Sequence, residues 1–309
     1  MGGFQLNEFI ELIEQENIGK VRLNEPLKKH TSWKIGGPAD IMIQPDHKEG
    51  LVMTLRSIQK YRLPYIIIGR GSNLLVRDGG FRGVVVKLGS GLDHLSVQDE
   101  FVTAGAGYSL IKLANVIAKQ GLSGLEFAGG IPGTVGGAVY MNAGAHGSDI
   151  SHILYSAEVL FDDGELTVLK NEELRFSYRH SILQKTRKGV CLEATFRLQK
   201  KDKEAIKAEM LKHKKYRQQT QPLQDANACC GSVFRNPKPH SAGALIEQAG
   251  LKGYRIGDAQ VSPLHANFIV NLGQATAKDV LALIDHIQKT IVEKFDVHMR
   301  PEVQVVGED

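Results

Sequence analysis

The sequence lacks the features of a membrane-bound or secreted protein. No apolar run of 18 residues occurs among its 309, so no membrane span is expected. The N-terminus carries acidic residues where a secretory signal needs a basic start and an apolar stretch. Cys191, Cys229 and Cys230 are too few, and wrongly spaced, for a disulfide framework or a thiolate zinc site. We therefore expect a cytoplasmic protein that makes no membrane contact.

Common metal, nucleic-acid and nucleotide signatures are also missing. The 11 histidines are scattered and form no metal-ligand motif, so we expect no bound metal. The net charge of +4, from 38 basic and 34 acidic residues, is spread along the chain and suggests no nucleic-acid partner. The motif that begins at Gly69 has Leu74 where a G-x-G-x-x-G turn needs its third glycine. No G-x-x-x-x-G-K-[ST] loop is present.

Hydrophobic periodicity predicts a mixture of helices and strands, with a small α/β unit in the first 88 residues. Helices are expected at 6–18 (ended by Gly19), 51–61, 108–120, 203–219 and 276–295, and strands at 39–44, 65–69, 84–88 and 302–306. The last helix is expected to bury a face made by Val280, Ile284, Ile287, Ile291 and Phe295. The chain is long for one core, and its composition changes near residues 89 and 200, so we expect two or three subdomains.

Two glycine-rich segments are the strongest local signals. Residues 66–76 form an apolar run that leads into Gly-Arg-Gly-Ser-Asn, and residues 121–147 contain nine glycines. Glycine lets backbone N–H groups approach a ligand closely, and successive N–H groups can form a concave anion site. Tight turns in a β-rich fold would explain either cluster alone. Together they favour a dinucleotide site to which Ser72 and Asn73 add hydrogen bonds.

In their order and spacing, five motifs resemble one family of flavoproteins. They lie at residues 69–73, 124–137, 176–181, 230–237 and 300–303. The first two resemble the FAD-binding core of vanillyl-alcohol-oxidase-type flavoproteins. The whole set resembles the UDP-N-acetylenolpyruvoylglucosamine reductase family over about residues 27–307. Only 53 residues separate Arg179 from Ser232, which implies the shorter, second branch of that family.

The resemblance implies an α+β fold and a set of cofactor contacts. Two α/β subdomains, residues 1–88 with 297–309 and residues 89–199, would form the FAD-binding module, and residues 200–296 a smaller α+β substrate-binding domain. Non-covalent FAD would be held by Gly69, Arg70, Gly71, Ser72, Asn73, Gly129, Gly130, Ile131, Pro132, Gly133, Gly136 and Gly137.

The resemblance also implies a reaction. NADPH would supply a hydride, through the flavin, to the vinyl carbon of UDP-N-acetylglucosamine enolpyruvate, giving UDP-N-acetylmuramate for peptidoglycan synthesis. Arg179 would stabilise charge on the substrate carboxylate, Ser232 would donate a proton, and Glu302 would lie beside the carboxylate. Tyr178, Arg217 and Asn236 would contact the substrate. No obligatory protein partner is implied.

Several alternatives remain open at this point. Another FAD oxidoreductase of the same fold, or a catalytically silent module that binds flavin or a nucleotide sugar, would share the glycine-rich segments. Arg217 lies at the end of a basic helix and can equally be a solvated charge. Cys230 can be interpreted as a reactive thiol, although a small apolar residue in a loop is the simpler interpretation.

Overall fold

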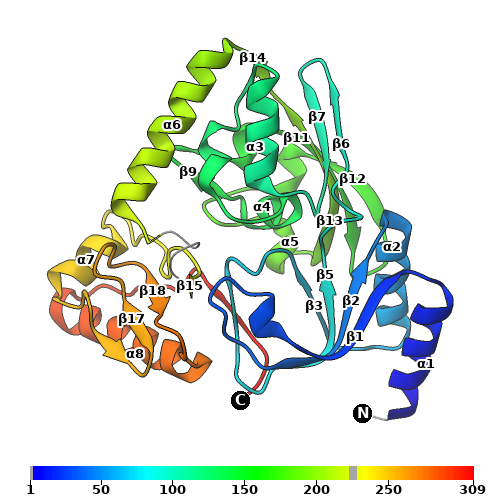
Figure 1. Ribbon diagram of the computed structural model, residues 1–309, viewed down its shortest axis with the longest axis horizontal. Helices are drawn as coiled ribbons and strands as arrows, with labels where there is room; N and C mark the ends of the chain where they lie inside the picture. Colours follow the sequence, from blue (N-terminus) through cyan, green and yellow to red (C-terminus); the bar gives the residue numbers. More distant parts are fainter. Residues whose placement is uncertain (1–2, 223–227) are drawn as a thin grey trace. The chain divides into compact units, whose positions relative to one another are not determined.

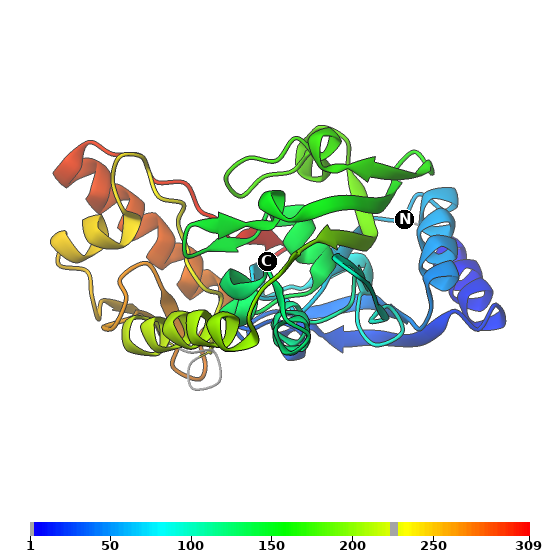
Figure 2. The same ribbon diagram turned by 90° about the horizontal axis from the view of Figure 1, so that it is seen from above.

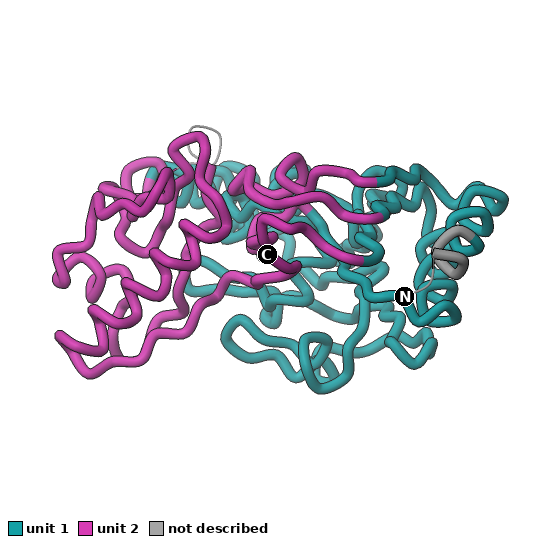
Figure 3. The backbone as a smooth tube through the Cα atoms, turned by 90° about the horizontal axis from the view of Figure 1, so that it is seen from below, with its two compact units in different colours: residues 1–23, 41–69, 83–215 teal, residues 24–40, 70–82, 216–309 magenta. Residues whose placement is uncertain are grey.

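The computed structural model describes residues 3–222 and 228–309, which form two compact units (Figure 3). Unit 1 consists of the residues up to 23, residues 41–69 and residues 83–215. Unit 2 consists of residues 24–40, 70–82 and 216–309. Helices and strands occur in both units, so the expected α+β class is confirmed.

Unit 1 contains most of a four-stranded sheet with the order β1-β2-β5-β3. Its strands are β1 (Gly19–Pro26), β2 (Pro38–Pro45), β5 (Phe81–Lys87) and β3 (Tyr65–Ile68), the last two of which are parallel. Helices α1 (Gly3–Gln15) and α2 (Lys48–Lys60) lie side by side (Figure 1). These helices and the sheet share a core that includes Phe9, Ile13, Ile41, Leu51, Leu55, Val84 and Val86.

Helix α1 ends earlier than the sequence predicted. It stops at Gln15 rather than at residue 18, because Asn17 has a left-handed backbone (φ 49°) that an α-helix does not accommodate. Gly19, the predicted end of the helix, instead begins β1. The prediction of the helix is therefore confirmed, but the prediction of its end is wrong.

A second sheet in unit 1 is antiparallel, with the order β12-β11-β13-β7-β6. Its strands are β6 (Leu95–Gln98), β7 (Phe101–Gly105), β11 (Leu154–Phe161), β12 (Leu166–Lys170) and β13 (Gly189–Arg197). Helices α3 (Leu110–Lys119) and α4 (Val135–Met141) cover one of its faces (Figure 1). Shorter elements complete the unit: β8 (Leu122–Ser123) with β14 (Gln199–Lys200), β9 (Gly144–Ala145) with β10 (Ser148–Asp149), and α5 (Ile182–Lys185).

Unit 2 contains a small antiparallel sheet with the order β15-β18-β17-β16. Its strands are β15 (Ala228–Cys229), β18 (Ile269–Asn271), β17 (Ala259–Val261) and β16 (Arg255–Ile256). Helices α7 (Ala242–Gln248) and α8 (Ala277–Phe295) lie beside each other (Figures 1 and 2), and β19 (Gln304–Val306) pairs in parallel with β4 (Leu74–Val76). Trp33, the only tryptophan in the chain, is fully buried here and donates from Nε1 to Ile269 O at 2.7 Å.

The remaining predicted elements are confirmed to within a few residues at their ends. They correspond to β2, α2, β3, β5, α3, α8, β19 and α6 (Lys203–Thr220). As predicted, α8 buries Val280, Ile284, Ile287 and Ile291, and Phe295 packs partly buried against the same core. Helices α4 and α7 escape prediction because each has only 7 residues and α4 begins inside a glycine-rich segment.

Within residues 3–222 and 228–309, no helix is both long enough and apolar enough to span a membrane.

Candidate active site

The two glycine-rich segments meet in unit 1, where Gly69 lies against Thr134. Gly69 directly follows β3, and a Cβ atom on it would lie 2.5 Å from Thr134 Oγ1. Thr134 in turn caps α4, because its side chain accepts the N–H of Gly137. Any other residue at position 69 would collide with this cap, so the close approach of the two segments depends on glycine.

Part of the second glycine-rich segment lies in α4 and is buried there. The N–H of Gly136 donates to Ala106 O at 2.9 Å, and a Cβ atom on Gly136 would lie 2.9 Å from Ala106 Cβ. Gly136 therefore permits close packing of the helix. Residues 129–133 are half-buried and Gly137 is exposed. A ligand can therefore reach these residues.

Arg179 lies in a tight turn that is fixed to the C-terminal end of α4. Ser177 and His180 exchange backbone hydrogen bonds of 3.1 and 3.0 Å across the turn. Asn142, buried and left-handed at the end of α4, donates from Nδ2 to Ser177 O at 3.1 Å. Because its Oδ1 also accepts the N–H of Ser151 at 3.0 Å, the amide group is held from both ends. The turn thus takes its position from the glycine-rich segment.

The side chain of Arg179 is oriented by two contacts. Its Nη2 donates to Gly144 O at 2.9 Å, and its guanidinium lies 5.1 Å from the centre of the Tyr178 ring. Arg179 itself has φ 56°, and Tyr178 is 47% exposed. A half-buried guanidinium with a fixed plane suits bidentate binding of a carboxylate.

In unit 2, residues 70–73 complete the first glycine-rich segment. Gly71 has φ 63°, and a Cβ atom on it would lie 2.2 Å from His30 O. The turn therefore closes directly against the chain at residues 30–32, where the N–H of Ser32 donates to Gly71 O at 3.1 Å. Asn73, at the end of the turn, donates from Nδ2 to the backbone oxygen of Glu302 at 3.2 Å.

Ser232 and Glu302 are brought together in unit 2. Their segments run antiparallel, with a β-bridge between Phe234 and Pro301. The N–H of Glu302 donates to the oxygen of Val233, the residue after Ser232, at 2.7 Å. Both predicted catalytic residues are half-buried. The structure thus joins a hydroxyl and a carboxyl residue that are 70 positions apart in the sequence.

Cys230 is a buried residue of the loop and not an accessible thiol. It is 4% exposed, and its Sγ donates to Ser72 O at 3.1 Å. Burial raises the pKa of the Cys230 thiol far above its usual value, so the group stays protonated. The structure supports the simpler of the two interpretations. The thiol ties the Ser232 segment to the turn at residues 70–73.

The other predicted substrate contacts have structural partners. Arg217 is half-buried beside Cys229, and burial lowers the pKa of its guanidinium, an effect that the Cys229 sulfur opposes. It is therefore not a fully solvated charge. Asn236 is exposed, and its Oδ1 accepts the N–H of Ala242 at 3.0 Å at the start of α7.

Each unit therefore holds its own group of predicted residues. Arg179, Tyr178 and residues 129–137 belong to unit 1, whereas Ser232, Glu302, Arg217, Asn236 and residues 70–73 belong to unit 2. Sequence reasoning missed Thr134 and Asn142, which hold the group in unit 1, and Asn267 in unit 2, whose side chain bonds to the backbone of Phe234. The first two carry a signal, because Thr is common at helix N-caps and Asn in left-handed C-terminal positions. Asn267 carries none.

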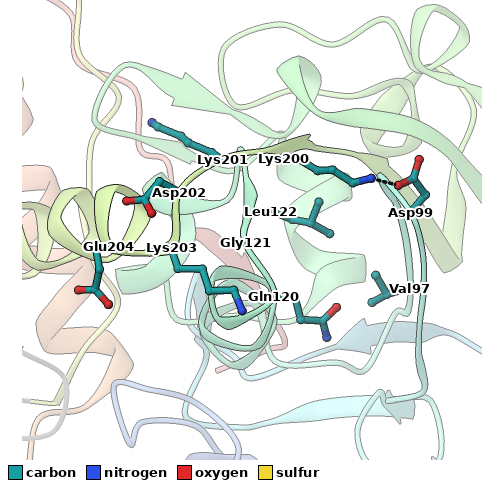
Figure 4. A pocket seen from close by; sticks show the side chains of 10 residues that line it. All are labelled: Val97, Asp99, Gln120, Gly121, Leu122, Lys200, Lys201, Asp202, Lys203 and Glu204. Atoms are coloured by element: carbon teal, nitrogen blue, oxygen red, sulfur yellow. Dashed lines mark ion pairs between the residues drawn. The ribbon is translucent and has the colours of Figure 1, made fainter.

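A recess of about 670 Å³ lies elsewhere in unit 1 (Figure 4). It is lined by Val97, Asp99, Gln120, Gly121, Leu122, Lys200, Lys201, Asp202, Lys203 and Glu204. Lys200 and Asp99 form an ion pair at its edge. No predicted site residue lines it. Within residues 3–222 and 228–309, no group of three His, Cys, Asp or Glu residues is arranged to hold a metal ion.

Comparison with known proteins decides the family. Residues 221–306 match the family described as UDP-N-acetylenolpyruvoylglucosamine reductase, C-terminal domain, and residues 39–170 match the FAD binding domain. The UDP-N-acetylenolpyruvoylglucosamine reductase of Anoxybacillus flavithermus is 60% identical over 96% of this chain and 98% of its own. The chain belongs to the UDP-N-acetylenolpyruvoylglucosamine reductase family.

Two further comparisons agree with membership of the UDP-N-acetylenolpyruvoylglucosamine reductase family. The Bacillus subtilis protein of that name is 56% identical over 98% of this chain and 99% of its own. The solved structure of UDP-N-acetylenolpyruvylglucosamine reductase from Thermus caldophilus is 38% identical, with a TM-score of 0.79, and covers 93% of this chain and 98% of that chain. The family resemblance of the five motifs is confirmed.

The residues present fit an FAD, the cofactor of this family. The FAD binding domain matches residues 39–170, and this range contains both glycine-rich segments. In unit 1 these segments approach so closely that a Cβ atom on Gly69 would overlap Thr134. Residues 129–133 are half-buried, directly precede Thr134 and include three glycines, so their backbone can approach a pyrophosphate closely.

Proposed function

We propose that the chain reduces the enolpyruvyl ether of UDP-N-acetylglucosamine enolpyruvate to UDP-N-acetylmuramate, with NADPH as the reductant, for peptidoglycan synthesis. Relatives named UDP-N-acetylenolpyruvoylglucosamine reductase match this chain over nearly their full length. The observation of the structure that carries the proposal is the adjacency of Ser232 and Glu302, beside the turn at residues 70–73. A flavin-binding module without catalysis has no need of this pair.

The reaction adds a hydride to one carbon of a double bond and a proton to its neighbour. FAD, when bound, supplies the hydride transfer from NADPH to the vinyl carbon. The residues of the chain must then stabilise the negative charge that moves onto the substrate carboxylate, and must deliver the proton.

Arg179 stabilises the developing charge in this proposal. Its guanidinium remains cationic, and its planar fork can pair with both oxygens of the substrate carboxylate. The contacts with Gly144 O and the Tyr178 ring orient the fork before substrate arrives. Preorganised groups of this kind stabilise a transition state more than a ground state, because they need no rearrangement during the reaction.

Ser232 delivers the proton in this proposal, and Glu302 lies at the same carboxylate. A hydroxyl is a weak acid, but an enolate carbon is strongly basic, so a hydroxyl within hydrogen-bond reach can serve. The backbone of Glu302 is held at its N–H by Val233 and at its oxygen by Asn73. This fixes the start of its side chain relative to Ser232.

The remaining assignments follow the same family pattern. FAD is held by residues 69–73 and by residues 129–133 with Gly136 and Gly137, and the FAD-binding subdomains are residues 1–88 with 297–309 and residues 89–199. Residues 200–296 bind substrate, with contacts from Tyr178, Arg217 and Asn236. We place the enzyme in the cytoplasm, because Cys191, Cys229 and Cys230 are buried and not joined in disulfides, as is common in reducing compartments. It needs no partner protein, nucleic acid or membrane.

Replacement of Ser232 by Ala tests the proposal. The variant should purify with bound flavin, and NADPH should still bleach the flavin absorbance at the wild-type rate. Reoxidation of the reduced flavin by UDP-N-acetylglucosamine enolpyruvate, followed anaerobically by stopped flow, should slow by about 10²- to 10⁴-fold, because the proton donor is lost. Wild-type turnover by the variant would show that Ser232 is not the acid. If wild-type protein fails to oxidise NADPH with this substrate, the function itself is wrong.

A further inference from the structure

The side chain of Asn267 binds both polar backbone groups of Phe234. Its Oδ1 accepts the N–H of Phe234 at 2.9 Å, and its Nδ2 donates to Phe234 O at 2.8 Å. Asn267 is only 5% exposed, so water does not compete for these bonds. An amide side chain that pairs in this way with one residue imitates a neighbouring β-strand.

The contact continues at Val233, whose backbone N–H and oxygen both form hydrogen bonds. The N–H of Val233 donates to the backbone oxygen of Asn267 at 2.9 Å. On the other edge, Val233 O accepts the N–H of Glu302 at 2.7 Å. All four polar backbone groups of Val233 and Phe234 are therefore bonded, three of them to Asn267 and the fourth to Glu302.

This arrangement positions Ser232 from its C-terminal side, whereas the bond from Cys230 Sγ to Ser72 O holds the chain two residues before it. Between these two points, Gly231 has φ 78°, and no atom of residues 3–222 or 228–309 lies within 4 Å of the place where its Cβ would be. Glycine is the most flexible residue, so it restrains Ser232 weakly. The fixed peptide groups that follow Ser232 are the ones that Asn267 holds.

We propose that Asn267 is a positioning residue for the proton-transfer step, which it serves by holding the Ser232 strand in register with Glu302. The proposal rests on the proposed function of Ser232. Asn267 touches neither substrate nor cofactor in this role. It acts because an error of about 1 Å in the position of an acid can slow a reaction by about 10²-fold.

Asn267 is itself held by the loop that precedes it. Its N–H donates to Nδ1 of His265 at 3.2 Å, and the N–H of Phe268 donates to His265 O at 3.0 Å. Ser262 Oγ accepts the N–H groups of Leu264 and His265 at 3.2 and 3.3 Å. A loop bonded at so many points can transmit a fixed position to the Asn267 side chain.

The test compares Asn267→Asp with Asn271→Asp. Asn271 is the last residue of β18 in the same unit, and its Nδ2 donates to Trp33 O at 2.9 Å. Each variant therefore loses one side-chain amide that donates to a backbone oxygen. Flavin reduction by NADPH should stay within about twofold of wild type in both variants. Flavin reoxidation by UDP-N-acetylglucosamine enolpyruvate should slow by about 10²-fold in Asn267→Asp only. Trp33 fluorescence confirms that both variants are folded.

A pH series separates positioning from general damage. When the new carboxyl of Asn267→Asp takes up a proton, it can again donate to Phe234 O while its other oxygen accepts the N–H of Phe234. The reoxidation rate, divided by the wild-type rate at the same pH, should therefore rise as pH falls. Wild type contains the same neighbouring groups, His265, Glu302 and Cys230, which is why each rate is divided by the wild-type rate at the same pH.

Two outcomes would overturn the positioning role. One is equal loss of the reoxidation rate in Asn267→Asp and Asn271→Asp. The other is a ratio to wild type that does not change with pH. Failure of the wild-type enzyme to reoxidise with this substrate would instead refute the proposed function, and the two failures are thus distinguishable.

Discussion

The two units hold their candidate residues in different ways. In unit 1, the turn that carries Arg179 is bonded to Asn142, Gly144 and Tyr140, all within about 40 residues along the chain. In unit 2, the surroundings of Ser232 come from residues 72, 267 and 302, which are separated by much of the sequence. The first arrangement is local and can be weakened piece by piece. The second depends on every segment, so one change in it should do more harm.

The largest effect is expected for Gly71→Ala in unit 2. The new Cβ would lie 2.2 Å from His30 O and 2.8 Å from the Cα of Thr31, and neither backbone atom can move alone. The variant should lose more than about 4 kcal/mol of unfolding free energy, or fail to accumulate as folded yellow protein. Urea unfolding followed by Trp33 fluorescence measures this.

Gly253→Ala is the matched control for this change. Gly253 has φ 77°, close to the φ of 63° at Gly71, but no atom of the described residues lies within 4 Å of its Cβ position. It should lose only the cost of a left-handed alanine, about 1–2 kcal/mol. Equal losses in the two variants would show that backbone strain, and not the contact with His30, accounts for the effect at Gly71.

A smaller effect is expected for Asn142→Ala in unit 1. This change removes the bonds to Ser177 O and to the N–H of Ser151, and it puts alanine into a left-handed conformation with φ 44°. We expect a loss of about 3 kcal/mol in unfolding free energy, with weaker substrate binding because the Arg179 turn is released.

Asn142→Gly separates the two causes. Glycine accepts the left-handed backbone but also lacks the amide, so it should recover about 1 kcal/mol of stability and none of the substrate affinity. Recovery of full affinity in Asn142→Gly, measured as the Michaelis constant for the enolpyruvyl substrate, would contradict the role assigned to the side chain.

The smallest effect is a dependence of stability on pH. Burial lowers the pKa of His265 from 6.5, and Lys252 adds to this shift while Glu247 opposes it. The fold therefore favours neutral His265, whose Nδ1 accepts the N–H of Asn267. Its contribution to stability is complete above about pH 6.5 and is lost as pH falls through the lower pKa of the folded state.

The variant His265→Asn sharpens this prediction. An asparagine oxygen can accept the same N–H but does not titrate in this range. Below pH 6.5 the unfolding free energy of wild type should fall more steeply than that of the variant, as measured by urea unfolding at a series of pH values. Parallel curves would mean that His265 does not contribute.

The sequence predicts the local features of both units well. The periodicity of residues 276–295 predicts helix α8 and its buried face, because a helix depends mainly on nearby residues. It misplaces the end of α1, where the left-handed backbone of Asn17 leaves no mark in the hydrophobic pattern.

The candidate site was harder to predict than the fold. Residues in recognisable motifs, such as Ser232 and Glu302, could be named, and the structure places their backbones side by side. The supporting role of Asn267 could not be named, because it depends on a contact 33 residues away with Phe234. Likewise, nothing in the sequence indicates that the Cys230 thiol donates a hydrogen bond to Ser72 O.

The make-up of unit 2 has a consequence for its synthesis on the ribosome. Trp33, Ile35 and Leu75 emerge early, but they share their core with residues beyond 229, which are made much later. Residues 83–215 of unit 1 are translated in between and can fold on their own neighbours first. The early apolar side chains must therefore remain unburied during this interval, when the nascent chain is most open to aggregation.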